Sequence, residues 1–126
     1  MLGGQPSAVK LRPYGTLHCI KTDLTIASGA TTSNALDTQG YPVTGFILPS
    51  TFDGTALAIH ASDAEAGTYV PLYDSDGNAI AMVVAASRAV GLTGVDGQAI
   101  SAFRWIKLVA DAQATTDTVI QAILKG

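Results

Sequence analysis

The chain has 126 residues, enough for one domain with its own core, and charged residues make up 13% of it while apolar residues make up 48%. Its net charge of −3, with only seven basic residues, argues against nucleic-acid binding through phosphate contacts. No apolar run approaches the ~20 residues of a membrane span, and no signal-peptide pattern precedes the domain, so we expect no membrane partner.

The first segment, Met1–Tyr14, contains glycines and prolines and has no usable periodicity. We expect an extended N-terminal arm, because such a segment cannot form a regular element of its own. A single domain is then expected over residues 15–126.

Short segments rich in β-branched residues follow the arm at intervals near ten residues, and Gly, Pro, Asp or Ser separate them. This spacing predicts an all-β protein, an antiparallel β-sandwich or a barrel. The predicted strands are Thr16–Ile26, Thr31–Asp37, Tyr41–Leu48, Thr55–Ser62, Thr68–Tyr73, Asn78–Ala85, Arg88–Leu92, Ala102–Ala110 and Thr118–Lys125. Asn78–Ala89 and Thr115–Lys125 also fit helices, but their β-branched residues favour strands.

Two predicted strands are apolar on both faces. In Thr55–Ser62 one face carries Leu57, Ile59 and Ala61, and the other carries Ala56, Ala58 and His60. In Asn78–Ala85 the two faces carry Ile80, Met82 and Val84, and Ala79, Ala81 and Val83. A strand that faces water on one side alternates between apolar and polar residues. Together with the low charge, this pattern predicts that other subunits cover part of the surface.

Acidic residues offer no site for a metal or for catalysis. The run Asp74–Asn78 has the composition of a calcium loop, but the sixth and twelfth positions hold Ala79 and Ala85, where an EF-hand needs Gly and Glu. We therefore interpret it as a hairpin turn in which Gly77 has a positive φ. Asp63 and Glu65 are interpreted as solvated loop charges, since no apolar cleft element accompanies them.

The nitrogen and sulfur ligands are His18, Cys19 and His60, and their spacing matches no zinc site. His18 and Cys19 are neighbours on a predicted strand, so their side chains point to opposite faces and cannot form a dyad. We expect a structural histidine and a buried free cysteine. No catalytic, cofactor-binding or metal-binding residue is predicted, and we expect no enzymatic activity.

Aromatic residues could line a sugar-binding face, and the candidates are Trp105, Tyr69, Tyr73, Tyr41 and Phe52. Trp105 lies in Phe103–Leu108, where each face of the strand mixes apolar and basic residues, so the core face is not decided by the pattern. We expect Trp105 to pack in the core or in an interface.

Three segments resemble a family of small β-sandwich virion proteins of tailed bacteriophages. They are Ile47–Phe52, Ala61–Gly77 (ASDAEAGTYVPLYDSDG) and Phe103–Leu108 (FRWIKL), and the resemblance extends over about Tyr41–Gly126. The segment Val109–Ala114 departs from the family's usual turn, which leaves the geometry around Asp111 open.

The resemblance implies a jelly-roll-like fold and a capsid cement or decoration protein, made in the host cytoplasm and bound to the capsid surface of the virion. Its partner would be the major capsid protein, which it would bind as a homo-oligomer, with a trimer favoured. The alternatives are a carbohydrate-binding module and a module of a tail or head fibre that serves host attachment.

Overall fold

The computed structural model describes residues 19–125, so the predicted arm, Met1–Tyr14, lies outside the described residues. The elements are β1 (Cys19–Ile26), β2 (Leu36–Asp37), β3 (Val43–Ile47), β4 (Ala56–Ser62), β5 (Val70–Pro71), β6 (Ala81–Val83), β7 (Ala89–Gly91), α1 (Gly94–Ser101), β8 (Trp105–Ala110) and β9 (Thr118–Lys125). The one helix among them is too short to cross a membrane.

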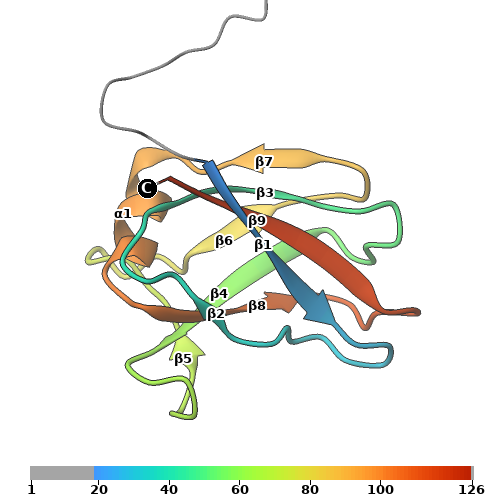
Figure 1. Ribbon diagram of the computed structural model, residues 1–126, viewed down its shortest axis with the longest axis horizontal. Helices are drawn as coiled ribbons and strands as arrows, with labels where there is room; N and C mark the ends of the chain where they lie inside the picture. Colours follow the sequence, from blue (N-terminus) through green and yellow to red (C-terminus); the bar gives the residue numbers. More distant parts are fainter. Residues whose placement is uncertain (1–18, 126) are drawn as a thin grey trace, which may run out of the picture.

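The strands form two antiparallel sheets that pack face to face (Figure 1). The first sheet has the order β1-β9-β3-β7, and the second has the order β2-β8-β4-β5, with β6 also paired to β4. The chain crosses to the opposite sheet at nearly every step, and the first and last strands pair with each other. This interleaving is that of a jelly roll. The predicted all-β sandwich is therefore confirmed.

The core lies between the sheets and is formed by alternate residues of each strand. On β4, Leu57 and Ile59 are buried, so the face with the larger side chains is the core face. On β8, Ile106 and Leu108 are buried while Trp105 is only half-buried, so the face that the sequence left undecided is now assigned. For Trp105, which we expected in the core or in an interface, the core is excluded because its side chain lies on the outer face, and packing in an interface stays a prediction.

The last strand, β9, runs over Thr118–Lys125 as predicted and lies in the middle of the first sheet. It pairs with β1 along its whole length and with β3 on its other side. Neighbours on both sides make β9 an interior strand of the sheet, with β3 pairing along Gln121–Leu124. The helical alternative for this segment is therefore excluded.

A short helix, α1, stands where the sequence predicted no regular element. It closes one end of the sandwich beside the C-terminal end of β9 (Figure 1), and it is anchored by Ile100, which is fully buried. Thr93 occupies its N-cap position and Asp96 lies in its first turn. This Thr-x-x-acid spacing is a helix-start signal, although Gly94 and Gly97 hide it by lowering the helical propensity.

Other predictions need correction. The predicted strand Ala102–Ala110 begins only at Trp105, and Thr68–Tyr73 shrinks to Val70–Pro71 because proline cannot donate a ladder hydrogen bond. Cys19 is exposed, so the expected buried cysteine is wrong. Its strand lies at the edge of the first sheet, where its side chain points outward.

Candidate functional site

The outer face of the second sheet carries small apolar side chains that lie next to one another. β4 pairs with β6 in the register Ala58–Ala81 and Ala56–Val83, and with β8 in the register Ala58–Val109. We call this set the small-residue face: Ala56, Ala58, Ala81, Val83 and Val109. Val83 is 82% exposed. The structure thus brings together residues of three strands, β4, β6 and β8, that lie far apart along the chain.

Hydrogen bonds to one carboxylate, that of Asp111, tie two strands together at one end of the small-residue face. We call this contact the clamp. Asp111, just after β8, accepts hydrogen bonds from the Thr55 amide at 2.8 Å, the Ala56 amide at 3.1 Å and the Thr55 hydroxyl at 2.9 Å. These bonds, first the one from the Thr55 amide, lower the pKa of Asp111 from its ordinary value. The clamp ties the start of β4 to the end of β8 and settles the geometry around Asp111.

Glycine is required next to this clamp. Gly54 has φ +102°, and a Cβ placed on it would overlap Asp111 Oδ1. Only a residue without a side chain lets the carboxylate approach the amide of the following residue. The loop before β4 is therefore shaped by one glycine and one aspartate.

The opposite end of the second sheet is polar and basic. Lys107 Nζ lies 4.5 Å from the centroid of the Tyr69 ring, and the Arg104 guanidinium lies 5.4 Å from that of Trp105. Burial, and then the charge of Glu65, raises the pKa of Tyr69. These contacts form a polar rim beside the small-residue face.

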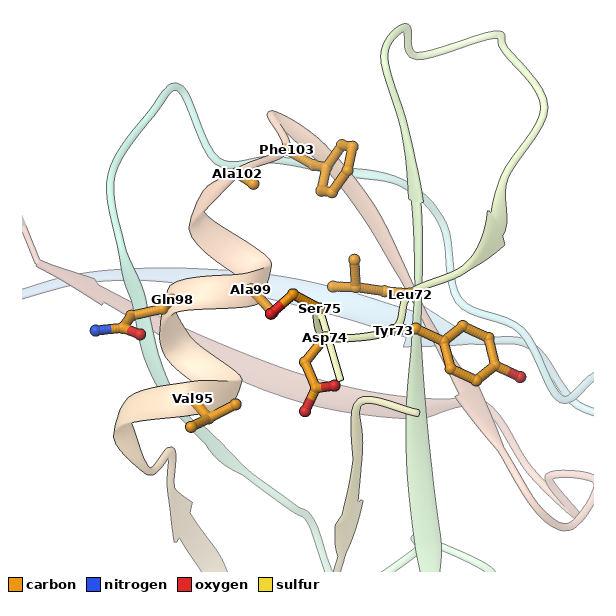
Figure 2. Close-up of a pocket in the computed structure, with 9 residues that line it drawn as sticks. All are labelled: Leu72, Tyr73, Asp74, Ser75, Val95, Gln98, Ala99, Ala102 and Phe103. Carbon is orange, nitrogen blue, oxygen red and sulfur yellow. The ribbon is translucent and has the colours of Figure 1, made fainter. Parts of the chain in front are cut away.

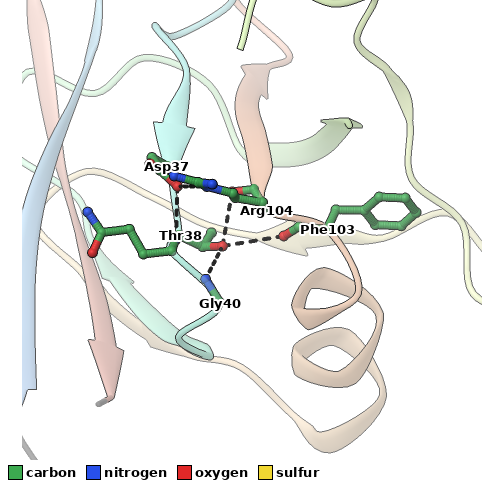
Figure 3. Close-up of polar contacts among 6 residues, drawn as sticks. Asp37, Thr38, Gly40, Phe103 and Arg104 are labelled. Carbon is green, nitrogen blue, oxygen red and sulfur yellow. Dashed lines mark hydrogen bonds and ion pairs between the residues drawn. The ribbon is translucent and has the colours of Figure 1, made fainter. Parts of the chain in front are cut away.

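Arg104 also binds Asp37 on β2, through bonds of 2.7 Å and 2.9 Å (Figure 3). The bond to Arg104 lowers the pKa of Asp37, and the amide of Gln39 adds to the effect. Beside the pair, the Thr38 hydroxyl donates to the Arg104 carbonyl oxygen at 2.9 Å. The rim is thus fastened to the edge strand of the sheet.

The aromatic residues considered for sugar binding do not meet. Phe52 is buried in the core, so its inclusion as a surface candidate is wrong. Tyr73 and Tyr41 are exposed, but they line two different depressions. Tyr69 and Trp105 each have a cation over the ring. No open aromatic platform forms among the described residues.

The loop carboxylates and the histidine lie apart from one another. Asp63 and Glu65 are exposed in the loop after β4. His60 is half-buried on the outer face, opposite Lys107 in the neighbouring strand. Within residues 19–125 no group of His, Cys, Asp or Glu could hold a metal ion.

The run from Asp74 forms the predicted hairpin turn. Asp74 Oδ1 accepts from the amides of Asp76 and Asn78 at 2.9 Å each, and Gly77 has φ +85°. The amide of Asn78 is the main cause that lowers the pKa of Asp74. The bond from the Asp76 amide is that of an Asx turn, and the Asn78 side-chain amide donates to the other carboxylate oxygen.

A groove that the sequence did not predict lies between α1 and this turn (Figure 2). Its volume is about 290 Å³, and exposed apolar side chains of Tyr73, Val95 and Phe103 line it. The sequence could not indicate this groove, because the helix that forms one wall was itself missed.

Comparisons with known proteins bear on the fold. No known protein family and no curated protein matches the sequence. The structure resembles the crystal structure of the SPBc2 prophage-derived protein YomS, with a TM-score of 0.50 and 14% sequence identity, over 86% of this chain and 96% of that chain. At this level of identity the two proteins share a fold, and a shared fold does not by itself establish a shared function.

Proposed function

We propose that this protein is a capsid cement or decoration protein of a tailed bacteriophage. It binds the outside of the head and stabilises the contacts between major capsid protein subunits. It acts by binding and converts no substrate. The observation that carries the proposal is the small-residue face, an apolar surface that is exposed at Ala81 and Val83 and half-buried at its other residues, in a chain with 13% charged residues.

Two further observations support the proposal. The segments Ile47–Phe52, Ala61–Gly77 and Phe103–Leu108 resemble small virion proteins of tailed phages. The structure resembles a protein that is described as prophage-derived. Both observations support the proposal less than the small-residue face does. They concern likeness to other proteins, whereas the face is a surface that a capsid protein could contact.

The stabilisation follows from mass action. A ligand that binds assembled capsid subunits and not separated ones raises the free energy needed to separate them. The increase is about 2.7 kcal/mol when the free ligand concentration is 100 times its dissociation constant. Small side chains such as Ala58 and Ala81 permit close approach of another backbone, which increases the contact per residue. Several copies on one capsid add avidity.

Co-sedimentation with empty capsids tests the proposal, with one charged substitution on each sheet. Ala58→Glu puts a carboxylate in the middle of the small-residue face, and Ala89→Glu puts the same group on exposed β7 of the other sheet. We expect the first variant to lose most capsid binding and the second to keep it. Wild-type protein that stays in the supernatant, or equal binding by both variants, would overturn the proposal.

The N-terminal segment is proposed as a second contact. Deletion of residues 1–14 should weaken co-sedimentation while the circular dichroism of the sandwich stays unchanged. Equal binding by the truncated protein would remove the arm from the proposal.

The carbohydrate-binding alternative has less support, because the aromatic candidates are dispersed and two of them carry a cation over the ring. Glycan binding that is lost in Trp105→Ala would favour it nevertheless.

A further inference from the structure

Among residues 19–125, no strand lies beside the β6 edge of the second sheet, and β6 carries no charge. In the β4–β6 ladder the hydrogen-bonded partners on the β6 side are Ile80, Met82 and Val84. Alternate residues of an antiparallel strand direct their backbone groups to opposite sides. The N–H and C=O groups of Ala81 and Val83 therefore point away from β4, and no described residue pairs with them.

The other edge strands have features that discourage pairing. β1 carries Lys21 and Asp23, and its Thr25 bonds to Asn34. β2 carries Asp37, and β5 contains a proline. β7 follows Arg88 directly and contains a glycine, which weakens a strand. Charges, prolines and short irregular strands are the means by which proteins protect sheet edges.

β6 is also short, with three residues, but it contains no charged residue, no proline and no glycine. No charged residue occurs from Gly77 to Ser87. Val83 is 82% exposed, and Ala81 is exposed beside it. A partner strand that carried charges would find no counter-charge here, whereas a second copy of the same uncharged strand would meet no like charge. The edge is therefore complementary to itself.

We propose that two copies of this protein pair through β6 about a two-fold axis, which joins their second sheets into one continuous sheet. With the axis at Met82, Ala81 of one copy lies opposite Val83 of the other. Each such pair exchanges both of its main-chain hydrogen bonds. The contact is isologous, so it closes at two copies.

The pairing also has a consequence for the small-residue face. A two-fold axis between antiparallel edge strands runs perpendicular to the sheet, so both copies present the same face to the same side. The two small-residue faces then form one surface of twice the area, which a bivalent contact could use. The pairing itself follows from the edge, but the use of the joined surface on a capsid rests on the proposed function.

Light scattering of the purified full chain tests the pairing. We expect wild-type protein at twice the chain mass of 12.9 kDa, and Val83→Lys at the mass of one chain, since an edge lysine opposes strand addition. Val119→Lys, on the outer face of the first sheet, is the matched control and should stay paired. A wild-type monomer at every concentration, a trimer, or a Val83→Lys variant that remains paired would overturn the proposal.

Hydrogen exchange provides a second readout that needs no substitution. The amides of Ala81 and Val83 should exchange slowly in concentrated wild-type protein and faster after dilution, while the amide of Met82, bonded to β4, stays protected. Fast exchange at Ala81 and Val83 at all concentrations would contradict the pairing. Paired protein that ignores capsids would leave this inference standing and remove only the proposed function.

Discussion

Arg104 and Asp37 join the start of β8 to the edge strand β2 by two parallel hydrogen bonds, Nε to Oδ1 at 2.7 Å and Nη2 to Oδ2 at 2.9 Å. The planar guanidinium matches the carboxylate in a way that an ammonium group cannot. The pair lies at the surface, with the arginine side chain 61% exposed, so solvent weakens it.

Arg104→Lys should therefore lower the melting temperature slightly at low salt, because one of the two bonds is lost. The difference from wild type should shrink at high salt, as screening weakens the pair. Thermal unfolding at two salt concentrations measures both effects. Arg88→Lys is the control, since Arg88 forms no ion pair with the described residues. An equal loss in both variants would contradict the role of the pair.

Acid should destabilise the protein through Asp111. Its pKa is lowered in the folded state, so the contribution to stability is present above the ordinary value of 3.8 and is lost as the pH falls through the lower, folded value. Asp111→Asn should lower the melting temperature at neutral pH. It should also flatten the plot of melting temperature against pH below pH 3.8. Asp63→Asn, in the exposed loop, serves as control and should follow wild type throughout the titration.

Substitution of Gly54 should cost more stability than substitution of Gly77. Both residues have positive φ, at +102° and +85°, but only Gly54 has the Asp111 carboxylate where a Cβ would go. Gly77→Ala should lower the free energy of unfolding by about 1 kcal/mol through backbone strain alone. Gly54→Ala should lower it by about 3 kcal/mol, from strain together with loss of the clamp. Urea denaturation compares the two, and equal costs would argue against the clamp.

The two faces of the second sheet should respond differently to truncation. Leu57 is fully buried, and Leu57→Ala should lower the free energy of unfolding by about 3 kcal/mol, since it leaves a cavity. Val83→Ala, on the outer face, should change the free energy of unfolding of the monomer by less than about 0.5 kcal/mol. Denaturation at low protein concentration makes the comparison. A large cost at Val83 under these conditions would show that its side chain packs within the chain.

Much of the fold could be predicted because strand patterns are local. Alternation grouped Leu57 and Ile59 on one face of their strand, and the structure buries that face, while β9 was predicted with its bounds. The core face of β8 could not be predicted, because Trp105 and Lys107 on one side are as amphipathic as Arg104 on the other. Only packing against the facing sheet decides such a strand.

The candidate surface was predicted in part. The second faces of two strands were singled out by their alanines and valines, but the register that brings Ala58 beside Ala81 and Val109 depends on which strands become neighbours. The clamp at Asp111 gave no signal in the sequence, since its partners Thr55 and Ala56 lie more than 50 residues away along the chain.

The sequence by itself determined what each segment could form: short strands, the turn at Gly77, a chain with few charges, and strands apolar on both faces. These properties are set by nearest neighbours, through backbone sterics and side-chain alternation. The tertiary structure decided which edges remain open, which aromatic rings are covered by cations, and that α1 closes one end. Those outcomes depend on contacts between segments far apart in the chain, and no local pattern contains them.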